Sequence, residues 1–151
     1  MKILDVCCGG RLFYFEPDSP LVTFMDTRKG EVEFSPGRTI NIEPDVVGDF
    51  RRIPFNAEAY DMVVFDPPHL IYAGKNSWLA KKYGTLSKDA WKSDIRTGFS
   101  ECFRVLKPDG ILVFKWNTDQ IPLRDVLSLA IHKPLFGDKR GKTYWIIFVK
   151  E

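Results

Sequence analysis

Residues 60–69 read YDMVVFDPPH, an apolar run that ends abruptly in an aspartate and two prolines. Met62 to Phe65 are apolar without interruption, which is typical of a strand that is buried on both faces of a sheet. Pro67 and Pro68 cannot continue a central strand, because each lacks a backbone N–H. We therefore expect a strand over 60–65 whose carboxyl end presents Asp66.

Working outward, four further short apolar runs predict strands at 3–6, 21–25, 45–47 and 111–114. Helices are expected from Ser87, where apolar residues recur at spacings of three and four as far as Leu106, and from Thr118. Two final strands, near 131–136 and over 144–149, are joined too tightly for a right-handed crossover, so they should pair antiparallel. The expected fold is an α/β, Rossmann-like, doubly wound and mostly parallel sheet, covered on both faces, with an antiparallel C-terminal strand.

The connecting segments are less regular. We expect one or two helical turns at 11–15, stopped by Pro17, and a basic turn at 137–142. Apolar residues alternate with polar ones over 32–42 around a Ser-Pro-Gly turn, which predicts a small hairpin. Residues 70–86 are mixed in character and contain glycine, asparagine and serine, so we expect a loop there.

Length and composition bound the class of protein. The 151 residues predict one domain, over 1–151. Apolar residues make up 44% of the chain, which excludes disorder. No apolar run approaches the roughly 18 residues that span a membrane, and Asp5 interrupts the N-terminal run, so no signal peptide is expected. The three cysteines lack zinc spacing, and Cys7 and Cys8 are adjacent. We expect a cytoplasmic protein without a metal or a membrane contact.

Aspartates stand at the carboxyl ends of four expected strands. They are Asp5, Asp26, Asp49 and Asp66. In an open α/β sheet, ligands bind at this edge. Four carboxylates along it therefore indicate a polar ligand laid across the sheet, and Lys115, Trp116 and Asn117 reach the same edge after the last parallel strand.

The chain resembles the class I S-adenosylmethionine-dependent methyltransferases over essentially its whole length. Residues 3–10, ILDVCCGG, are similar to the family's acidic residue and glycine-rich turn, and 103–110, FRVLKPDG, to its turn before the fifth strand. The resemblance implies S-adenosylmethionine as cofactor, with Asp5, Cys7 and Gly9 at the turn, Asp26 on the ribose and Asp49 on the adenine. Cys7 and Arg11 depart from the glycines usual at their positions.

The charge distribution agrees with this cofactor. Residues 1–70 carry a net charge of −5 and residues 71–151 a net charge of +7. A negative first half suits a sulfonium cation better than a pyrophosphate. The absence of G-x-G-x-x-G after the first strand also counts against a nicotinamide enzyme.

A second motif, Asp66-Pro67-Pro68-His69, resembles the D-P-P-Y/F/W signature of methyltransferases that act on the amino groups of adenine, cytosine or guanine. An exocyclic amine of a base is a poor nucleophile, because its lone pair is delocalised into the ring. Asp66 and the Pro67 carbonyl are expected to accept its hydrogens, the prolines to hold the loop rigid, and His69 to stack on the base.

The loop after this motif is basic and aromatic, which is typical of a nucleic-acid platform. Over 71–92 it contains Lys75, Lys81, Lys82, Lys88 and Lys92, interleaved with Tyr72, Trp78, Tyr83 and Trp91. We expect Trp78, Lys81, Lys82 and Trp116 to contact the substrate. The expected partner is DNA or RNA as substrate. The chain has no separate recognition domain, so recognition of a long target sequence would need a partner subunit, or the sequence specificity would be low.

Two alternatives stay open at the level of sequence. The first is a methyltransferase for a small molecule or a protein, with the basic loop as a lid. The second is an inactive cofactor-binding scaffold or subunit, which the altered glycine turn and His69 would suit.

Overall fold

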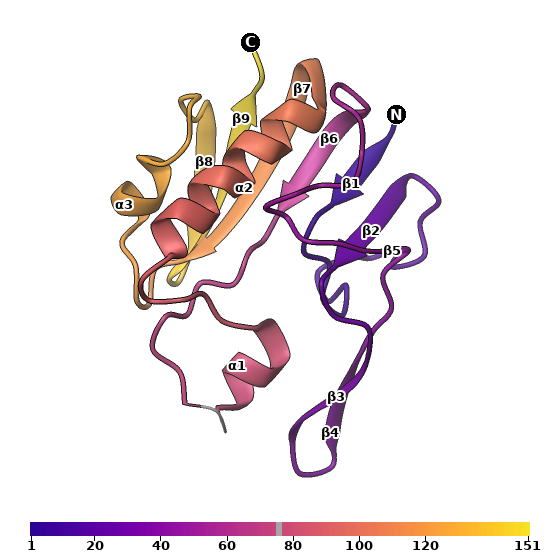
Figure 1. Ribbon diagram of the computed structural model, residues 1–151, viewed down its shortest axis with the longest axis vertical. Coiled ribbons are helices and arrows are strands. Elements are labelled where there is room, and N and C mark those ends of the chain that lie inside the picture. The colour runs from indigo at the N-terminus through magenta and orange to yellow at the C-terminus, as the bar shows by residue number, and fades with distance from the viewer. Residues whose placement is uncertain (75–76) are drawn as a thin grey trace.

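A computed structural model of the chain describes residues 1–74 and 77–151; Lys75 of the basic loop lies outside the described residues. Seven strands form one sheet in the order β5-β2-β1-β6-β7-β9-β8. Their bounds are β1 (Ile3–Asp5), β2 (Val22–Asp26), β5 (Val46–Val47), β6 (Tyr60–Phe65), β7 (Leu106–Asn117), β8 (Phe136–Arg140) and β9 (Thr143–Val149). The first five pair in parallel, and β9 runs antiparallel to both β7 and β8. The predicted mostly parallel sheet with an antiparallel strand near its C-terminal edge is confirmed (Figure 1).

The order of the strands reverses between β1 and β6. The chain runs outward from β1 through β2 to β5, then returns to place β6 and β7 on the other side of β1. Such a switch point opens a crevice at the carboxyl ends of the two central strands. The fold therefore puts the turn after β1 beside the Asp-Pro-Pro-His segment after β6.

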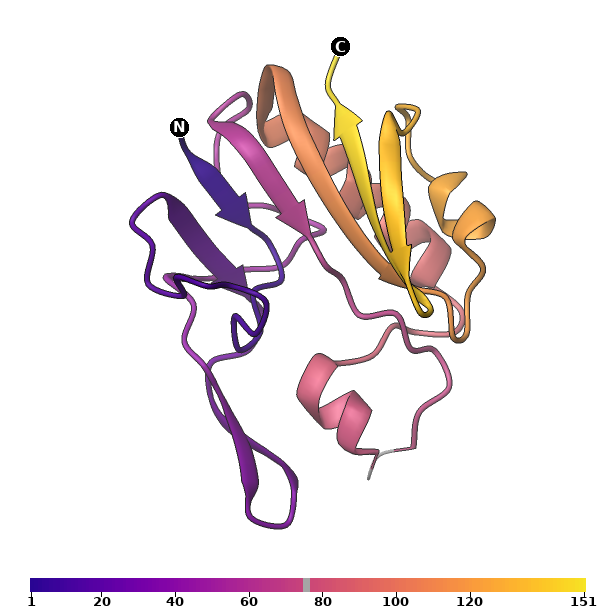
Figure 2. The ribbon, with the colours of Figure 1, turned by 180° about the vertical axis from the view of Figure 1, so that it is seen from behind.

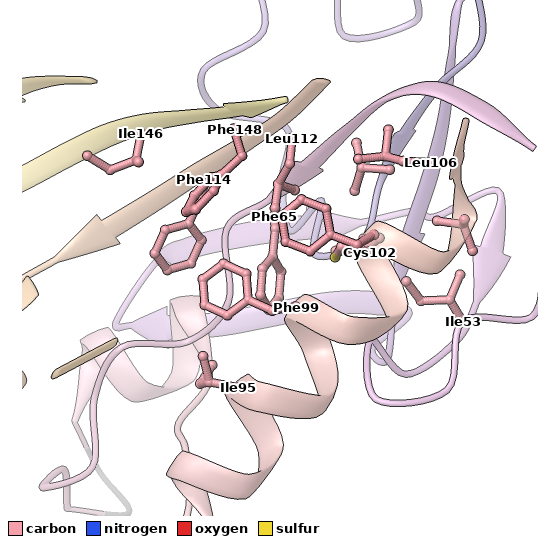
Figure 3. Packing of buried hydrophobic residues seen from close by; sticks show 14 of the residues in the cluster. Ile53, Phe65, Ile95, Phe99, Cys102, Leu106, Leu112, Phe114, Ile146 and Phe148 are labelled. Atoms are coloured by element: carbon pink, nitrogen blue, oxygen red, sulfur yellow. The ribbon is translucent and has the colours of Figure 1, made fainter. Parts of the chain in front are cut away.

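One face of the sheet is covered by α2 (Trp91–Val105), as Figure 3 shows. The apolar stripe of this helix carries Ile95 and Phe99, both fully buried, against Phe65 and Phe114 of the sheet. The ring centroids of Phe99 and Phe114 lie 4.7 Å apart. The helix starts four residues later than predicted, and the Trp91 N–H donates to the Ser87 carbonyl in a preceding turn.

The opposite face carries no helix among the residues that the structure describes, so the expectation of helical cover on both faces is wrong (Figure 2). The segment 11–15 lies there as turns, so the predicted helical turns are wrong. Arg11 has φ of 58°, a left-handed conformation that cannot propagate a right-handed helix. Aromatic contacts cover part of the face instead: Phe13 meets Trp145 edge-on, and Tyr14 meets Phe24.

A hairpin of β3 (Gly30–Ser35) and β4 (Arg38–Ile42) follows β2 and projects from the carboxyl edge, as predicted from its alternation (Figure 1). Beside it lies α1 (Trp78–Tyr83), within the segment expected to be a loop. Ser77 accepts a hydrogen bond of 3.4 Å from the Ala80 N–H at the start of this helix. The ring of Trp78 lies 6.4 Å from that of Phe34 in the hairpin. Tertiary contact thus holds a helix that is too short to form alone.

Two elements near the C-terminus differ from their predicted bounds. Helix α3 covers only Leu123–Leu127, although a helix was expected from Thr118. Strand β8 begins at Phe136 and takes up most of the expected basic turn, because Arg140 pairs with Thr143 around Gly141, whose φ is 61°. The antiparallel pairing itself is as predicted. No helix of the described residues is long and apolar enough to cross a membrane.

Candidate active site

A cavity of about 620 Å³ opens at the carboxyl ends of the parallel strands. Its walls come from the turn after β1, from 26–28 at the end of β2, from 66–70 after β6, and from Lys115, Asn117 and Asp119 at and just beyond the end of β7. The hairpin adds Ile40, and the segment 79–85 covers the opening. The switch point of the sheet is therefore the place where a ligand would bind.

The floor of the cavity is the turn after β1. Asp5 is fully buried directly beneath it and accepts hydrogen bonds from the Cys7 N–H, at 3.1 Å, and from the Tyr14 hydroxyl, at 2.8 Å. Burial raises the pKa of Asp5 to about 7, although both hydrogen bonds oppose the rise. Gly9 has φ of 50°, and a Cβ there would meet no atom within 4 Å, so its backbone is open to the cavity. Cys7 itself lines the floor.

Asp26 stands at the end of β2, where it is tied to both neighbouring segments. One carboxylate oxygen accepts the Gly9 N–H at 2.9 Å, and the other accepts the Arg28 N–H at 2.9 Å. The Arg28 guanidinium also donates to the carbonyl oxygens of Lys81 and Lys82 at 3.2 and 3.1 Å. A single arginine thus connects the carboxylate at the cavity wall to the C-terminal end of α1.

Asp49 does not line the cavity. Its carboxylate pairs with the Arg51 guanidinium at 2.6 Å, and this ion pair holds the pKa of Asp49 below its usual range. The neighbouring Phe50 lines the cavity instead and packs on Phe65, with ring centroids 5.3 Å apart. The predicted contact of Asp49 with the adenine is therefore not supported by its position. Phe50, next to Asp49 in the sequence, is the lining residue that the sequence interpretation missed.

The Asp-Pro-Pro-His segment lines the cavity beside the floor, with all four residues at its wall. Burial raises the pKa of Asp66, while the Lys115 ammonium, 3.0 Å from its Oδ2, opposes the rise. Burial and the charge of Lys115 both lower the pKa of His69, so its imidazole is neutral near pH 7. Phe65 pairs with Phe114 in the sheet, so the residues that follow, Asp66 and Lys115, lie side by side.

Trp116 is a core residue, which corrects its prediction as a substrate contact. It is 1% exposed, stacks on Phe114 at 5.8 Å and donates from Nε1 to the Ile121 carbonyl at 3.1 Å. Side chains alternate along β7, so Trp116 points to the face of α2 while Lys115 and Asn117 line the cavity. Only the edge of Trp116 approaches the site, where its ring lies 6.3 Å from that of His69.

The rim of the cavity is basic and aromatic. Lys82 and Tyr83 of α1 line it on one side, and Lys142, paired with Asp119 at 2.8 Å, lines it on the other. Trp78 and Lys81 lie outside the lining, and Trp78 is half-exposed. Among the residues described, no cluster of three or more histidine, cysteine or acidic side chains is placed to hold a metal ion.

Three carboxyl groups lie close to the thiol of Cys7 at the floor. The negative charges of Asp5, Asp26 and Asp66 all help to raise the pKa of the Cys7 thiol, whose main cause is burial. Burial likewise raises the pKa of Cys8 to about 12. Both thiols are therefore protonated at neutral pH. Of the three carboxyl groups, Asp26 pairs with Arg28 and Asp66 pairs with Lys115.

The chain matches no family model and no curated protein, but its fold has many solved counterparts. The PH0226 protein of Pyrococcus horikoshii OT3 is 18% identical, with a TM-score of 0.62 over 99% of this chain and 82% of its own. A SAM-dependent methyltransferase of Aquifex aeolicus is 13% identical, with a TM-score of 0.58 over 100% and 82%.

A third counterpart was solved with ligands. It is the 1,6-didemethyltoxoflavin-N1-methyltransferase of Burkholderia thailandensis with bound 1,6-didemethyltoxoflavin and S-adenosylhomocysteine. It is 15% identical, with a TM-score of 0.56 over 98% of this chain and 70% of its own. These likenesses show that the chain has the Rossmann-like fold of SAM-dependent methyltransferases.

Proposed function

We propose that this chain is an S-adenosylmethionine-dependent methyltransferase that methylates the exocyclic amine of a nucleic-acid base, adenine or cytosine. The observation that carries the proposal is the shared cavity: Asp66, Pro67, Pro68 and His69 line the same space as Gly9 and Asp26. A cofactor end and a substrate end therefore meet at the switch point of one sheet.

The residues present fit the cofactor. The Asp26 carboxylate stands where two ribose hydroxyls can donate to it, as in other nucleotide-binding α/β folds. Ile40 and Phe50 supply apolar walls for an adenine ring, and the open backbone at Gly9 allows close approach. The carboxylates around Cys7 suit the sulfonium and amino cations. A cavity of about 620 Å³ is within the range of cofactor sites.

Methyl transfer to an amine needs a nucleophilic nitrogen and a group that accepts one proton. When bound, the cofactor supplies an electrophilic methyl group: the amine lone pair forms the new N–C bond, and the electrons of the broken C–S bond stay on sulfur. Asp66 and the Pro67 carbonyl accept from the amine and hold its lone pair toward the methyl group. Among the described residues Asp66 is bonded to Lys115 through Oδ2, so Oδ1 is available to accept the departing proton. Neutral His69 offers a flat ring for stacking.

The rim supports a polyanionic substrate. Lys82, Tyr83 and Lys142 line the cavity. Tyr72, outside the lining, exposes its ring, and the Lys88 ammonium lies 5.4 Å from that ring. Cations attract phosphates, and exposed aromatics accept unpaired bases. The basic character of 71–151 thus falls at the mouth of the site.

The test combines cofactor binding with methyl transfer. We expect calorimetry to detect saturable binding of S-adenosylmethionine, and tritiated methyl groups to enter a DNA or RNA pool. Asp66→Ala should lower turnover by about a thousandfold, because it removes the group that positions the amine, and should change the cofactor Kd by only a few-fold. Asp61→Ala is the matched control, since Asp61 pairs with Lys107 at the far end of β6.

The outcomes separate the alternatives. Label in small heterocycles but not in polynucleotides would point to a small-molecule methyltransferase. Cofactor binding without transfer to any pool would favour a scaffold. Absence of cofactor binding would refute the proposal.

A further inference from the structure

The ammonium of Lys115 and the carboxylate of Asp66 form an ion pair inside the cavity, 3.0 Å apart. Both side chains are about one-quarter exposed, and both line the cavity wall. The pair joins the ends of two neighbouring parallel strands, β6 and β7. It therefore places a hydrogen-bond donor directly beside a hydrogen-bond acceptor at the point where the substrate is expected.

Two aromatic rings fix the position of the ammonium. The Lys115 Nζ lies 5.2 Å from the ring centroid of Phe13 and 5.6 Å from that of Trp145. Trp145 is the direct cross-strand neighbour of Lys115 on β9, and Phe13 comes from the connection between β1 and β2. Attraction to two rings restricts a side chain that is otherwise flexible. The donor is thus held in place before any substrate binds.

The Lys115 ammonium has more N–H groups than it uses in hydrogen bonds to the described residues. A lysine carries three N–H groups, and Asp66 is the single acceptor within hydrogen-bond distance of Nζ among the described residues. The carboxylate likewise keeps Oδ1 for another donor. A ligand edge that complements the pair offers an N–H to Asp66 and, next to it, a lone pair to Lys115.

We propose that Lys115 is a specificity-determining residue that donates to the ring nitrogen adjacent to the methylated amine. The inference rests on the proposed function and narrows its substrate class to a heteroaromatic ring with an amine beside an unprotonated ring nitrogen. Adenine, through N1, and cytosine, through N3, present this edge. Aliphatic amines do not: they are cationic at neutral pH and lack the neighbouring acceptor, so the ammonium repels them.

The experiment compares each nucleoside with an analogue that replaces the ring nitrogen by C–H. Equilibrium dialysis, with S-adenosylhomocysteine saturating, measures adenosine against 1-deazaadenosine and cytidine against 3-deazacytidine. The wild type should bind its preferred nucleoside about ten- to a hundredfold more tightly than the matching analogue, as expected for one hydrogen bond to a charged group. Lys115→Met should reduce this ratio to within about twofold. Lys107→Met removes a lysine charge at the opposite end of β7, where Lys107 pairs with Asp61 outside the cavity lining, and should keep the ratio.

Each outcome decides a different claim. Equal affinity of the wild type for nucleoside and analogue would overturn the role of Lys115 while leaving base methylation intact. A ratio that survives in Lys115→Met would also overturn it. Binding of neither nucleoside would refute the proposed function itself. Should Lys115→Met fail to fold, the wild-type ratio and a Lys115→Arg variant, which retains a charged donor and should retain discrimination, still decide the question.

Discussion

The hydroxyl of Tyr14 donates a 2.8 Å hydrogen bond to the buried carboxyl group of Asp5. Tyr14 belongs to the segment that covers the helix-free face of the sheet, and Asp5 ends β1 beneath the cavity floor. This contact stabilises the charged form of Asp5 and so works against burial, which raises the pKa to about 7. The protonation state of Asp5 is therefore set partly by the segment that connects β1 to β2.

The affinity for S-adenosylmethionine should depend on pH. If the cationic cofactor requires ionised Asp5, a pKa of about 7 predicts that affinity rises roughly tenfold between pH 6 and pH 8. Tyr14→Phe removes a contact that lowers the pKa, so the midpoint should move to higher pH. Calorimetry across this range checks both. S-adenosylhomocysteine, which lacks the sulfonium charge, should give a shallower profile, and a flat profile for both would contradict the role of Asp5.

The stability of the chain without cofactor should also depend on the ionisation of Asp5, but it should fall as the pH rises. The pKa of Asp5 is raised from 3.8 to about 7, so between these values the folded chain binds more protons than the unfolded chain. The contribution of Asp5 is complete below about pH 4 and is lost as pH rises through 7. Relative to wild type, Asp5→Asn should gain about 1 kcal/mol in the free energy of unfolding per pH unit between pH 5 and 7. Urea denaturation at each pH measures this difference, which would stay constant if Asp5 titrated normally.

Arg11 should stabilise the turn after β1 despite its strained backbone. Its guanidinium donates to the Pro17 and Glu43 carbonyls at 2.7 and 2.5 Å and lies 3.8 Å over the ring of Phe24. Arg11→Ala loses these contacts and keeps φ of 58°, so we expect a loss of about 2–4 kcal/mol. Arg11→Gly should be about 1 kcal/mol less harmful, because glycine tolerates positive φ. Thermal and urea unfolding compare the two, and equal losses would show that the conformation carries no strain.

Gly98 should be intolerant of a methyl group. A Cβ there would lie 2.6 Å from Phe65 and 2.7 Å from Phe50, and Phe50 lines the cavity. Gly98→Ala is expected to destabilise the fold by about 1–3 kcal/mol through overpacking. It should also weaken cofactor binding, because the ring of Phe50 must move. Ser100→Ala, at an exposed position of α2, is the matched control. Unchanged stability and affinity in Gly98→Ala would show that the rings relax freely.

The parallel strands and β9 could be predicted from the sequence because each contains a short apolar run that ends in polar residues. Strand β8 was expected near 131–136 and lies instead at Phe136–Arg140, where the sequence is mostly polar. The hairpin after β2 was equally clear from its alternation. The segments 11–15 and 78–83 could not be predicted, since their structure depends on tertiary contacts. Arg11 takes a left-handed conformation in one, and Trp78 packs on the distant hairpin in the other. Helix α1 has little local signal of its own.

The residues of the candidate site likewise include some that could be predicted from the sequence and some that could not. Asp26 and Asp66 reach the cavity because they follow strands whose direction the sequence makes plain. Asp49 lies outside the cavity lining, where its carboxylate pairs with Arg51 two residues on. Trp116 was predicted to contact the substrate, but side chains alternate along β7, and its neighbours Lys115 and Asn117 line the cavity instead. The pairing of Lys115 with Asp66 spans 49 residues and depends on the register of β6 with β7, which composition and periodicity do not encode.

The helix-free face has a thermodynamic consequence. The folded chain exposes 8720 Å², whereas an average monomer of this mass exposes about 7,900 Å². A native state that already exposes more surface gains less on unfolding, so the heat capacity change and the denaturant m-value are small for a chain of this length. The stability curve is correspondingly flat. The free energy of unfolding should therefore vary less with temperature than for an average chain of this length.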